Sequence, residues 1–287
     1  MNYRHAYHAG NFADVVKHVT LIALLNALSK KETPFCYMDT HAGAGFYDLS
    51  SDFALKSKEY ENGIQKIIHQ NNPPPLIKQY LNCIHQINET PSSSLKFYPG
   101  SPMIAHSLLR KNDRIIACEL HPQEYQALKK MFVNDKQVAV HKRDGLIALN
   151  ALLPPAENRG LVLIDPPYEN PNEYQQIIQA LTTALKRFEN GIYAVWYPLK
   201  EKIHIEKWQH QLKNEIKKPI LLIELTIYPD LPKHLNGCGL LVINPPWQFD
   251  QTMQTILPWL WNALTINQQG AYQLISLGRI DNSLAGY

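Results

Sequence analysis

Two tetrapeptides with similar spelling end two apolar runs of this sequence: "DPPY" at 165–168 and "NPPW" at 244–247. Proline cannot continue a β-ladder and keeps the preceding residue extended, so either tetrapeptide can simply terminate a strand. The first one can also do chemistry, because the Asp165 carboxylate and the carbonyl of Pro166 offer two hydrogen-bond acceptors to a single amine.

The amine that such acceptors suit is the exocyclic N6 of adenine, whose lone pair is delocalised into the ring. Acceptors at Asp165 and Pro166 can draw this nitrogen toward tetrahedral geometry, and the carboxylate can receive the proton that it loses on transfer of a group. Tyr168 would stack on the base, which must leave its helix or loop to reach a pocket. We therefore predict catalytic roles for Asp165, Pro166 and Tyr168.

The elements that must position this motif form a predicted α/β sheet. Several of the strand-like stretches are almost continuously apolar, as parallel strands buried on both faces must be, and helix-period sequence fills most gaps between them. The predicted strands are 34–39, 114–120, 137–144, 160–165, 191–197, 221–227 and 239–244.

The last two predicted strands are joined by "YPDLPKHLNGC", which has two prolines and no helical periodicity. A parallel crossover needs a dozen or more residues, usually helical, so we expect the strand 239–244 to be antiparallel. A seven-stranded mixed sheet with its last strand antiparallel is typical of Rossmann-like methyltransferases. The end of that strand would then lie away from a ligand at the other edge, with Asn244 capping the strand and Trp247 packing in the core.

The stretch 48–97 contains two apolar helical faces separated by "NNPPP" at 71–75. We interpret it as a small helical subdomain, here called the insertion, within a core formed by residues 1–47 and 98–287. The alternative is an ordinary crossover helix followed by a loop.

Three features end successive predicted strands where an open α/β sheet binds its ligand. Gly43 and Gly45 in "DTHAGAG" allow a sharp turn and a close backbone approach. Glu119 could bind ribose hydroxyls, and Asp144 could accept from the exocyclic amine of a cofactor adenine. Taken singly, they are also compatible with a plain turn and with surface carboxylates or helix caps.

The chain contains neither GxGxxG nor GxxxxGK[ST], which disfavours a dinucleotide or a nucleoside triphosphate as the ligand. S-adenosylmethionine carries a ribose and an adenine without phosphates, and it fits these features better.

Length and composition indicate a globular protein: 287 residues, 45% hydrophobic and 18% charged, with a net charge of +3. The four cysteines lack CxxC spacing, which favours reduced thiols in a cytoplasmic protein. We expect no transmembrane helix and no secretory signal. The mildly basic balance permits a nucleic-acid partner without requiring one.

The segment "YRHAYHAGNFADVVKH" at 3–18, here called the N-terminal arm, precedes the first strand, with a helix expected to start near Asn11 or Asp14. Its histidines His5, His8 and His18 fit no zinc spacing, so we expect no metal. An arm rich in Tyr, Arg and His can close over a cofactor and offer stacking and phosphate contacts to nucleic acid.

Taken in order, "YRHAYHAGNFADVVKH", "DTHAGAG", "YPGSP", "ELHP", "DPPYE" and "NPPW" resemble the bacterial 23S rRNA (adenine-N6)-methyltransferase family designated RlmJ. The resemblance spans essentially the whole chain. It implies a class I methyltransferase fold and S-adenosylmethionine-dependent methylation of one adenine in unassembled 23S rRNA, and we expect a monomer.

By residue-for-residue match, the resemblance also implies three sets of contacts. The implied cofactor contacts are His18, His41, Ser101, Glu119, Asp144, Gly145 and Asp165. Asp165 is in addition the implied catalytic acceptor. The implied RNA-handling residues are Tyr3, His5 and Lys17.

Two alternatives share parts of this pattern. A DNA adenine-N6 methyltransferase would use the same "DPPY" chemistry but would be expected to carry a separate target-recognition domain, for which the insertion looks small. A non-catalytic RNA-binding protein on a methyltransferase scaffold would not bind S-adenosylmethionine. Methylation assays on RNA and DNA, and calorimetry with the cofactor, discriminate among the three.

Overall fold

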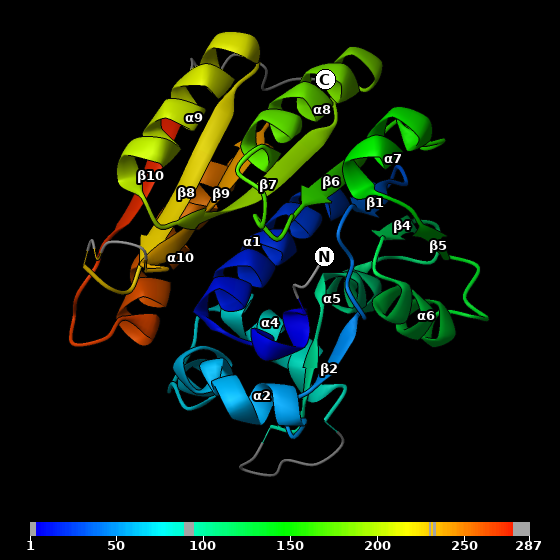
Figure 1. Ribbon diagram of the computed structural model, residues 1–287. Helices are drawn as coiled ribbons and strands as arrows, with labels where there is room; N and C mark the ends of the chain where they lie inside the picture. Colours follow the sequence, from blue (N-terminus) through cyan, green and yellow to red (C-terminus); the bar gives the residue numbers. More distant parts are fainter. Residues whose placement is uncertain (1–3, 89–94, 230, 232–233, 278–287) are drawn as a thin grey trace.

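The computed structural model describes residues 4–88, 95–229, 231 and 234–277, and an eight-stranded sheet runs through its centre (Figure 1). The strand order is β10-β8-β9-β7-β6-β1-β4-β5. The strands are β1 Cys36–Asp39, β4 Arg114–Glu119, β5 Val138–Lys142, β6 Gly160–Ile164, β7 Ile192–Leu199, β8 Ile220–Thr226, β9 Gly237–Ile243 and β10 Tyr272–Leu277.

The pairing of the strands confirms the predicted mixed sheet. β1 pairs in parallel with β4 and β6, and β4–β5 and β6–β7 are parallel as well. β9 runs antiparallel between β7 and β8, as expected for the last of the seven predicted strands. The eighth strand, β10, pairs antiparallel with β8. It was not predicted, because this edge strand has no buried residue and lacks the continuous apolar run of a strand covered on both faces.

Helices cover both faces of the sheet, so successive strand residues point into two different cores (Figure 1). Tyr37 and Ile115 pack on the side of α1, α5 and α10, whereas Met38 and Ile116 pack on the side of α7, α8 and α9. These helices and α6 are α1 Phe12–Ser29, α5 Ser101–Leu108, α6 Pro122–Met131, α7 Gly145–Leu152, α8 Glu173–Arg187, α9 Lys202–Glu215 and α10 Phe249–Leu264.

The central helix α1 begins where the sequence predicts, with Asn11 as its N-cap accepting from the backbone N–H of Asp14 at 2.9 Å. By length and hydropathy, α1 could cross a membrane, but 83% of it is buried inside the protein. This burial is typical of a core helix.

The insertion follows a small hairpin strand. β2 Phe46–Asp48 pairs antiparallel with β3 Phe97–Pro99, and between them lie α2 Asp52–Ser57, the 3₁₀ helix η2 Glu59–Asn62, α3 Ile64–Ile68 and α4 Pro75–His85. The second predicted apolar face is α4, whereas the first is split at Gly63 into η2 and α3. Gly63 has a non-helical backbone (φ −124°, ψ −108°), and only glycine fits there, because a Cβ on it would lie 2.1 Å from the carbonyl oxygen of Gly10 in the arm. The division into two domains stays a prediction.

The "NPPW" tetrapeptide lies at the edge of the sheet opposite the ends of the parallel strands. Asn244 donates from Nδ2 to the carbonyls of Glu189 and Gly191, which precede β7, at 2.9 and 2.8 Å. The expected position and strand-capping role of Asn244 are therefore confirmed. The expectation that Trp247 packs in the core is wrong: 57% of Trp247 is exposed, and Phe249, two residues later, is buried instead.

Candidate active site

A cavity of about 510 Å³ opens at the carboxyl ends of the parallel strands, within the size range of small-molecule sites. The loops after β1, β4, β5 and β6 meet there with the start of α1. The predicted site residues that line it are His5, Lys17, His18, His41, Ser101, Glu119, Asp144, Gly145, Asp165, Pro166 and Tyr168. Tyr3 lies outside the described residues.

The glycine loop after β1 is held by Glu119, the last residue of β4. Gly43 has a φ of +60°, a backbone conformation that residues with a side chain rarely adopt. Its N–H donates to Oε2 of Glu119 at 2.8 Å, while Oε1 accepts from the N–H of His121 at 2.6 Å. Burial raises the pKa of Glu119, and the two backbone donors offset part of that rise. Each carboxylate oxygen retains acceptor capacity for a ligand hydroxyl.

Ser101, the first residue of α5, is hydrogen-bonded to Asp39, the last residue of β1. The Asp39 carboxylate is fully buried and accepts from Ser101 Oγ at 2.6 Å and from Tyr37 Oη at 2.7 Å. Burial raises the pKa of Asp39, opposed by these hydrogen bonds. Asp39 was not among the predicted site residues. It does not line the cavity but supports Ser101, which does; its place at the end of the first strand, like that of Glu119 at the end of the second, was visible in the sequence.

Asp144 and Gly145 form the turn from β5 into α7. Asp144 caps the helix, its Oδ1 accepting from the N–H of Ile147 at 3.0 Å. A Cβ on Gly145 would lie 2.0 Å from the carbonyl oxygen of Thr40, so only glycine lets this turn approach the β1 loop. Burial lowers the pKa of the nearby His41 ring, although the charges of Asp165 and Asp144 oppose that shift.

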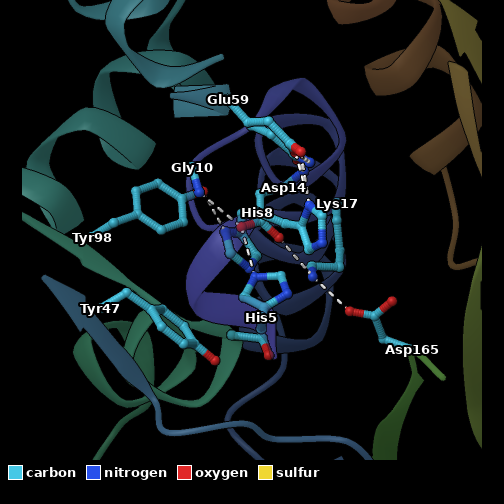
Figure 2. A network of polar contacts seen from close by, with 12 residues as sticks. His5, His8, Gly10, Asp14, Lys17, Tyr47, Glu59, Tyr98 and Asp165 are labelled. Atoms are coloured by element: carbon cyan, nitrogen blue, oxygen red, sulfur yellow. Dashed lines mark hydrogen bonds and ion pairs between the residues drawn. The ribbon is translucent and has the colours of Figure 1, made fainter. Parts of the chain in front are cut away.

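The Asp165 carboxylate contacts a buried lysine. Lys17 Nζ lies 2.6 Å from Asp165 Oδ2 and 2.8 Å from Asp14 Oδ1 (Figure 2). Burial disfavours the ammonium, but the two carboxylates outweigh it, so the pKa of Lys17 is raised well above its ordinary value. Burial also opposes ionisation of Asp14, yet the charges of His5 and Lys17 hold the pKa of Asp14 well below its usual range. Lys17 thus faces the cavity as part of an ion-pair network.

All three histidines of the arm, His5, His8 and His18, line the cavity. His5 Nε2 is 2.9 Å from Asp14 Oδ2, so it shares the carboxylate that binds Lys17. His18 is fully buried, with Nδ1 2.8 Å from Tyr98 Oη. Burial lowers the pKa of His18 to about 3, which makes its ring neutral at ordinary pH. Within the described part of the chain, His18 Nε2 has no hydrogen-bond partner.

Tyr168 follows the two prolines with a φ of +52°. Its hydroxyl donates to the carbonyl of Trp196 on β7 at 2.7 Å, and its ring centroid lies 4.7 Å from that of Tyr174. The strained turn therefore anchors one end of the ring on β7 while the residue still lines the cavity. Stacking on a base stays a prediction for Tyr168.

Among the residues described, no group of three or more His, Cys, Asp or Glu side chains could hold a metal ion. The cavity instead combines carboxylates at the ends of adjacent strands with a neutral histidine and close-packed glycines. Such a wall can bind a ligand that is rich in hydroxyl and amine donors, and Asp165 can accept from an amine or take its proton.

A family model described as "Ribosomal RNA large subunit methyltransferase D, RlmJ" matches residues 32–276. The chain belongs to this family. It is 43% identical over 265 residues to the ribosomal RNA large subunit methyltransferase J of Escherichia coli, covering 92% of this chain and 94% of that protein. It is 41% identical over 273 residues to the Haemophilus influenzae protein of the same name, covering 95% and 97%.

A solved structure agrees with these sequence matches. The crystal structure of a Legionella pneumophila protein is 41% identical, covers 94% of this chain and 98% of its own, and superposes with a TM-score of 0.86. The predicted family resemblance and the Rossmann-like methyltransferase fold are confirmed, with one more strand than expected.

Proposed function

We propose that this member of the RlmJ family transfers a methyl group from S-adenosylmethionine to N6 of one adenine in 23S rRNA, in the cytoplasm. The observation that carries the proposal is the position of Asp165 and Pro166. They directly follow β6 in the same cavity that Glu119 lines from the end of β4 and Asp144 from the turn after β5. A carboxylate suited to an exocyclic amine therefore borders a wall suited to a nucleoside.

The cavity wall fits S-adenosylmethionine by the chemistry of its donors and acceptors. Glu119 would accept from the ribose hydroxyls and Asp144 from the adenine amine, with Gly145 leaving room beside the β1 loop. The buried Nε2 of His18 has no hydrogen-bond partner among the described residues, as expected of a group that awaits a ligand. His41, Ser101 and Asp165 would complete the set of contacts. Bound there, the cofactor supplies an electrophilic methyl group.

The protein's own contribution is to hold and deprotonate the target amine. Asp165 and the Pro166 carbonyl would accept from the two N6 hydrogens and direct the lone pair toward the methyl group. As the new N–C bond replaces the bond between the methyl carbon and the cofactor's sulfonium sulfur, the nitrogen would lose a proton, and the Asp165 carboxylate is placed to receive it. Lys17, 2.6 Å from Asp165 Oδ2, orients that carboxylate.

We assign binding of the RNA to the N-terminal arm and to Tyr168. The target base must leave its stack to reach the cavity, and an aromatic ring beside Asp165 can replace the lost stacking. Tyr3, His5 and Lys17 would act at the arm. Naked 23S rRNA is the expected substrate, because the resemblance to the family implies methylation of unassembled 23S rRNA.

The test is a methylation assay with purified protein on naked 23S rRNA and, in parallel, on duplex DNA, followed by mass spectrometry of the nucleosides. We expect N6-methyladenine in the RNA only. Transfer to DNA alone would establish the DNA methyltransferase alternative. If neither substrate is methylated and calorimetry detects no binding of S-adenosylmethionine, a non-catalytic RNA-binding protein is the correct description.

A further inference from the structure

The part of the N-terminal arm that precedes α1 packs against α2 of the insertion. Ser57 Oγ donates to the carbonyl of Tyr7, and the Tyr7 ring meets the Phe53 ring edge-on with centroids 5.0 Å apart. The Arg4 guanidinium lies 5.4 Å from the centroid of the same Phe53 ring. Three contacts thus join the arm to α2 at one place.

The backbone of the insertion is equally close to the arm. Ile64 N–H donates to the carbonyl of Gly10 at 2.8 Å. Gly10 has a φ of +78°, and a Cβ on it would lie 2.9 Å from the Ile64 side chain. The turn that leads from the arm into α1 is therefore shaped to fit the start of α3.

A charged contact joins the same two parts through Glu59 of η2. Its Oε1 and Oε2 lie 2.9 and 3.0 Å from Nδ1 of His8, and Oε2 accepts from Asn11 Nδ2 at 2.9 Å. Asn11 is the N-cap of α1 and binds the N–H of Asp14 with its other side-chain atom. One carboxylate of the insertion therefore fixes the residue from which α1 starts.

Asn11, which lines the cavity wall, accepts from the N–H of Asp14, and Figure 2 shows how the polar contacts continue from Asp14 through Lys17 to Asp165. Asp14 Oδ2 accepts from the N–H of Gly10 at 2.9 Å, and Asp14 Oδ1 contacts Lys17 Nζ. Lys17 then holds Asp165 Oδ2. Glu59 stands at the surface end of this chain, 37% exposed, and Asp165 at the cavity end.

We propose that Glu59 is a positioning residue for methyl transfer. By holding His8 and Asn11 it fixes the start of α1, and through Asp14 and Lys17 it fixes the orientation of the Asp165 carboxylate. The inference rests on the proposed function for its effect on rate. The insertion then supplies no group to the reacting atoms but sets the position of one that does, and small misplacements of such a group are costly.

Two variants of Glu59 and one control test this role. Glu59→Ala removes the carboxylate, and Glu59→Gln keeps an oxygen that can accept from Asn11 Nδ2. Glu61→Ala is the matched control, because Glu61 lies on the same short helix and is exposed. The assays are kcat on 23S rRNA at saturating cofactor, cofactor affinity and stoichiometry by calorimetry, and hydrogen exchange of the arm by mass spectrometry.

For Glu59→Ala we expect kcat per cofactor-binding molecule to fall about five- to tenfold, the scale of losing hydrogen bonds to one partly exposed carboxylate. Cofactor affinity should stay within about twofold, and exchange of the amides of residues 5–17 should accelerate. Glu59→Gln should recover part of kcat, and Glu61→Ala should match the wild type.

Unchanged kcat and unchanged exchange in Glu59→Ala would overturn the proposal, as would an equal loss in Glu61→Ala. If Glu59→Ala fails to bind cofactor at full stoichiometry, Glu59→Gln is judged by the same two criteria. Exchange is measured without RNA, so it decides the link between Glu59 and the arm independently. A wild type that is inactive on RNA counts against the proposed function alone.

Discussion

Replacing Lys17 by methionine would remove a buried positive charge from between two carboxylates while preserving most of the side-chain length. Only 5% of Lys17 and 2% of Asp14 are exposed, so the pair is shielded from solvent. Removing one partner of a buried ion pair costs about 3–5 kcal/mol. Asp14 keeps the N–H of Gly10 and the ring of His5 as partners. We therefore expect the lower end, a loss of about 3 kcal/mol in the free energy of unfolding.

The measurement is equilibrium unfolding in urea, followed by circular dichroism, for Lys17→Met, Asp14→Asn and the double variant. Because the two groups share one ion pair, the double variant should be more stable than the sum of the single losses by about 2 kcal/mol. Lys207→Met, at an exposed position on α9, is the control and should change stability by less than about 0.5 kcal/mol.

The pH dependence supplies a second check with a definite sign. The folded-state pKa of Asp14 is depressed, so its stabilising contribution is present above the unfolded value of 3.8 and is lost as pH falls through the lowered folded pKa. Without Lys17 this depression shrinks, and the stability gap between wild type and Lys17→Met should narrow in acid. Additive single losses, or a Lys17→Met variant as stable as the wild type, would refute the ion-pair reasoning.

Three further outcomes follow from the cavity. Asp165→Asn should keep the fold and lower kcat about 100-fold or more, because the amide cannot take the amine proton; a methylation assay and circular dichroism check this. Gly145→Ala should cost about 1–3 kcal/mol of stability in urea unfolding and weaken cofactor binding, since its Cβ meets the Thr40 carbonyl. Buried neutral His18 has a pKa of about 3, so the unfolded chain binds its proton first as pH falls below 6.5. Stability should therefore drop by up to about 1.4 kcal/mol per pH unit from this group, and less steeply in His18→Gln.

The edge of the sheet that carries the site could be predicted from the sequence, because it depends on local signals. Glu119, Asp144 and Asp165 each follow an apolar strand, and parallel strands place their carboxyl ends together. The antiparallel β9 could be predicted as well, from a connection too short and too rich in proline for a crossover helix. Asp39 also ends an apolar strand, as Glu119 does, but we did not predict a role for it, because the glycines after it are the more conspicuous feature of that strand end.

The contacts that hold Asp165 could not be predicted in the same way. Lys17 and Asp165 are 148 residues apart, and no local pattern states that they meet. The resemblance assigned Lys17 to RNA handling, whereas in the fold its ammonium lies against the carboxylate assigned to catalysis. Likewise Glu59 sits in a segment whose periodicity indicates only helices, and its contacts with His8 and Asn11 depend on how the insertion packs.

"DPPY" and "NPPW" show why a motif is meaningful only together with the direction of its strand. Both follow a buried strand. The last residue of "DPPY", Tyr168, has a positive φ, whereas in "NPPW" the first residue, Asn244, has one and so does the following Gln248. Asp165 follows β6 and lies in the cavity, because β6 runs parallel to its neighbours β1 and β7. β9 runs the other way and delivers Asn244 to the carbonyls that precede β7. The direction of one strand thus separates the carboxylate that we propose to be catalytic from a strand cap, although the two tetrapeptides differ by only two letters.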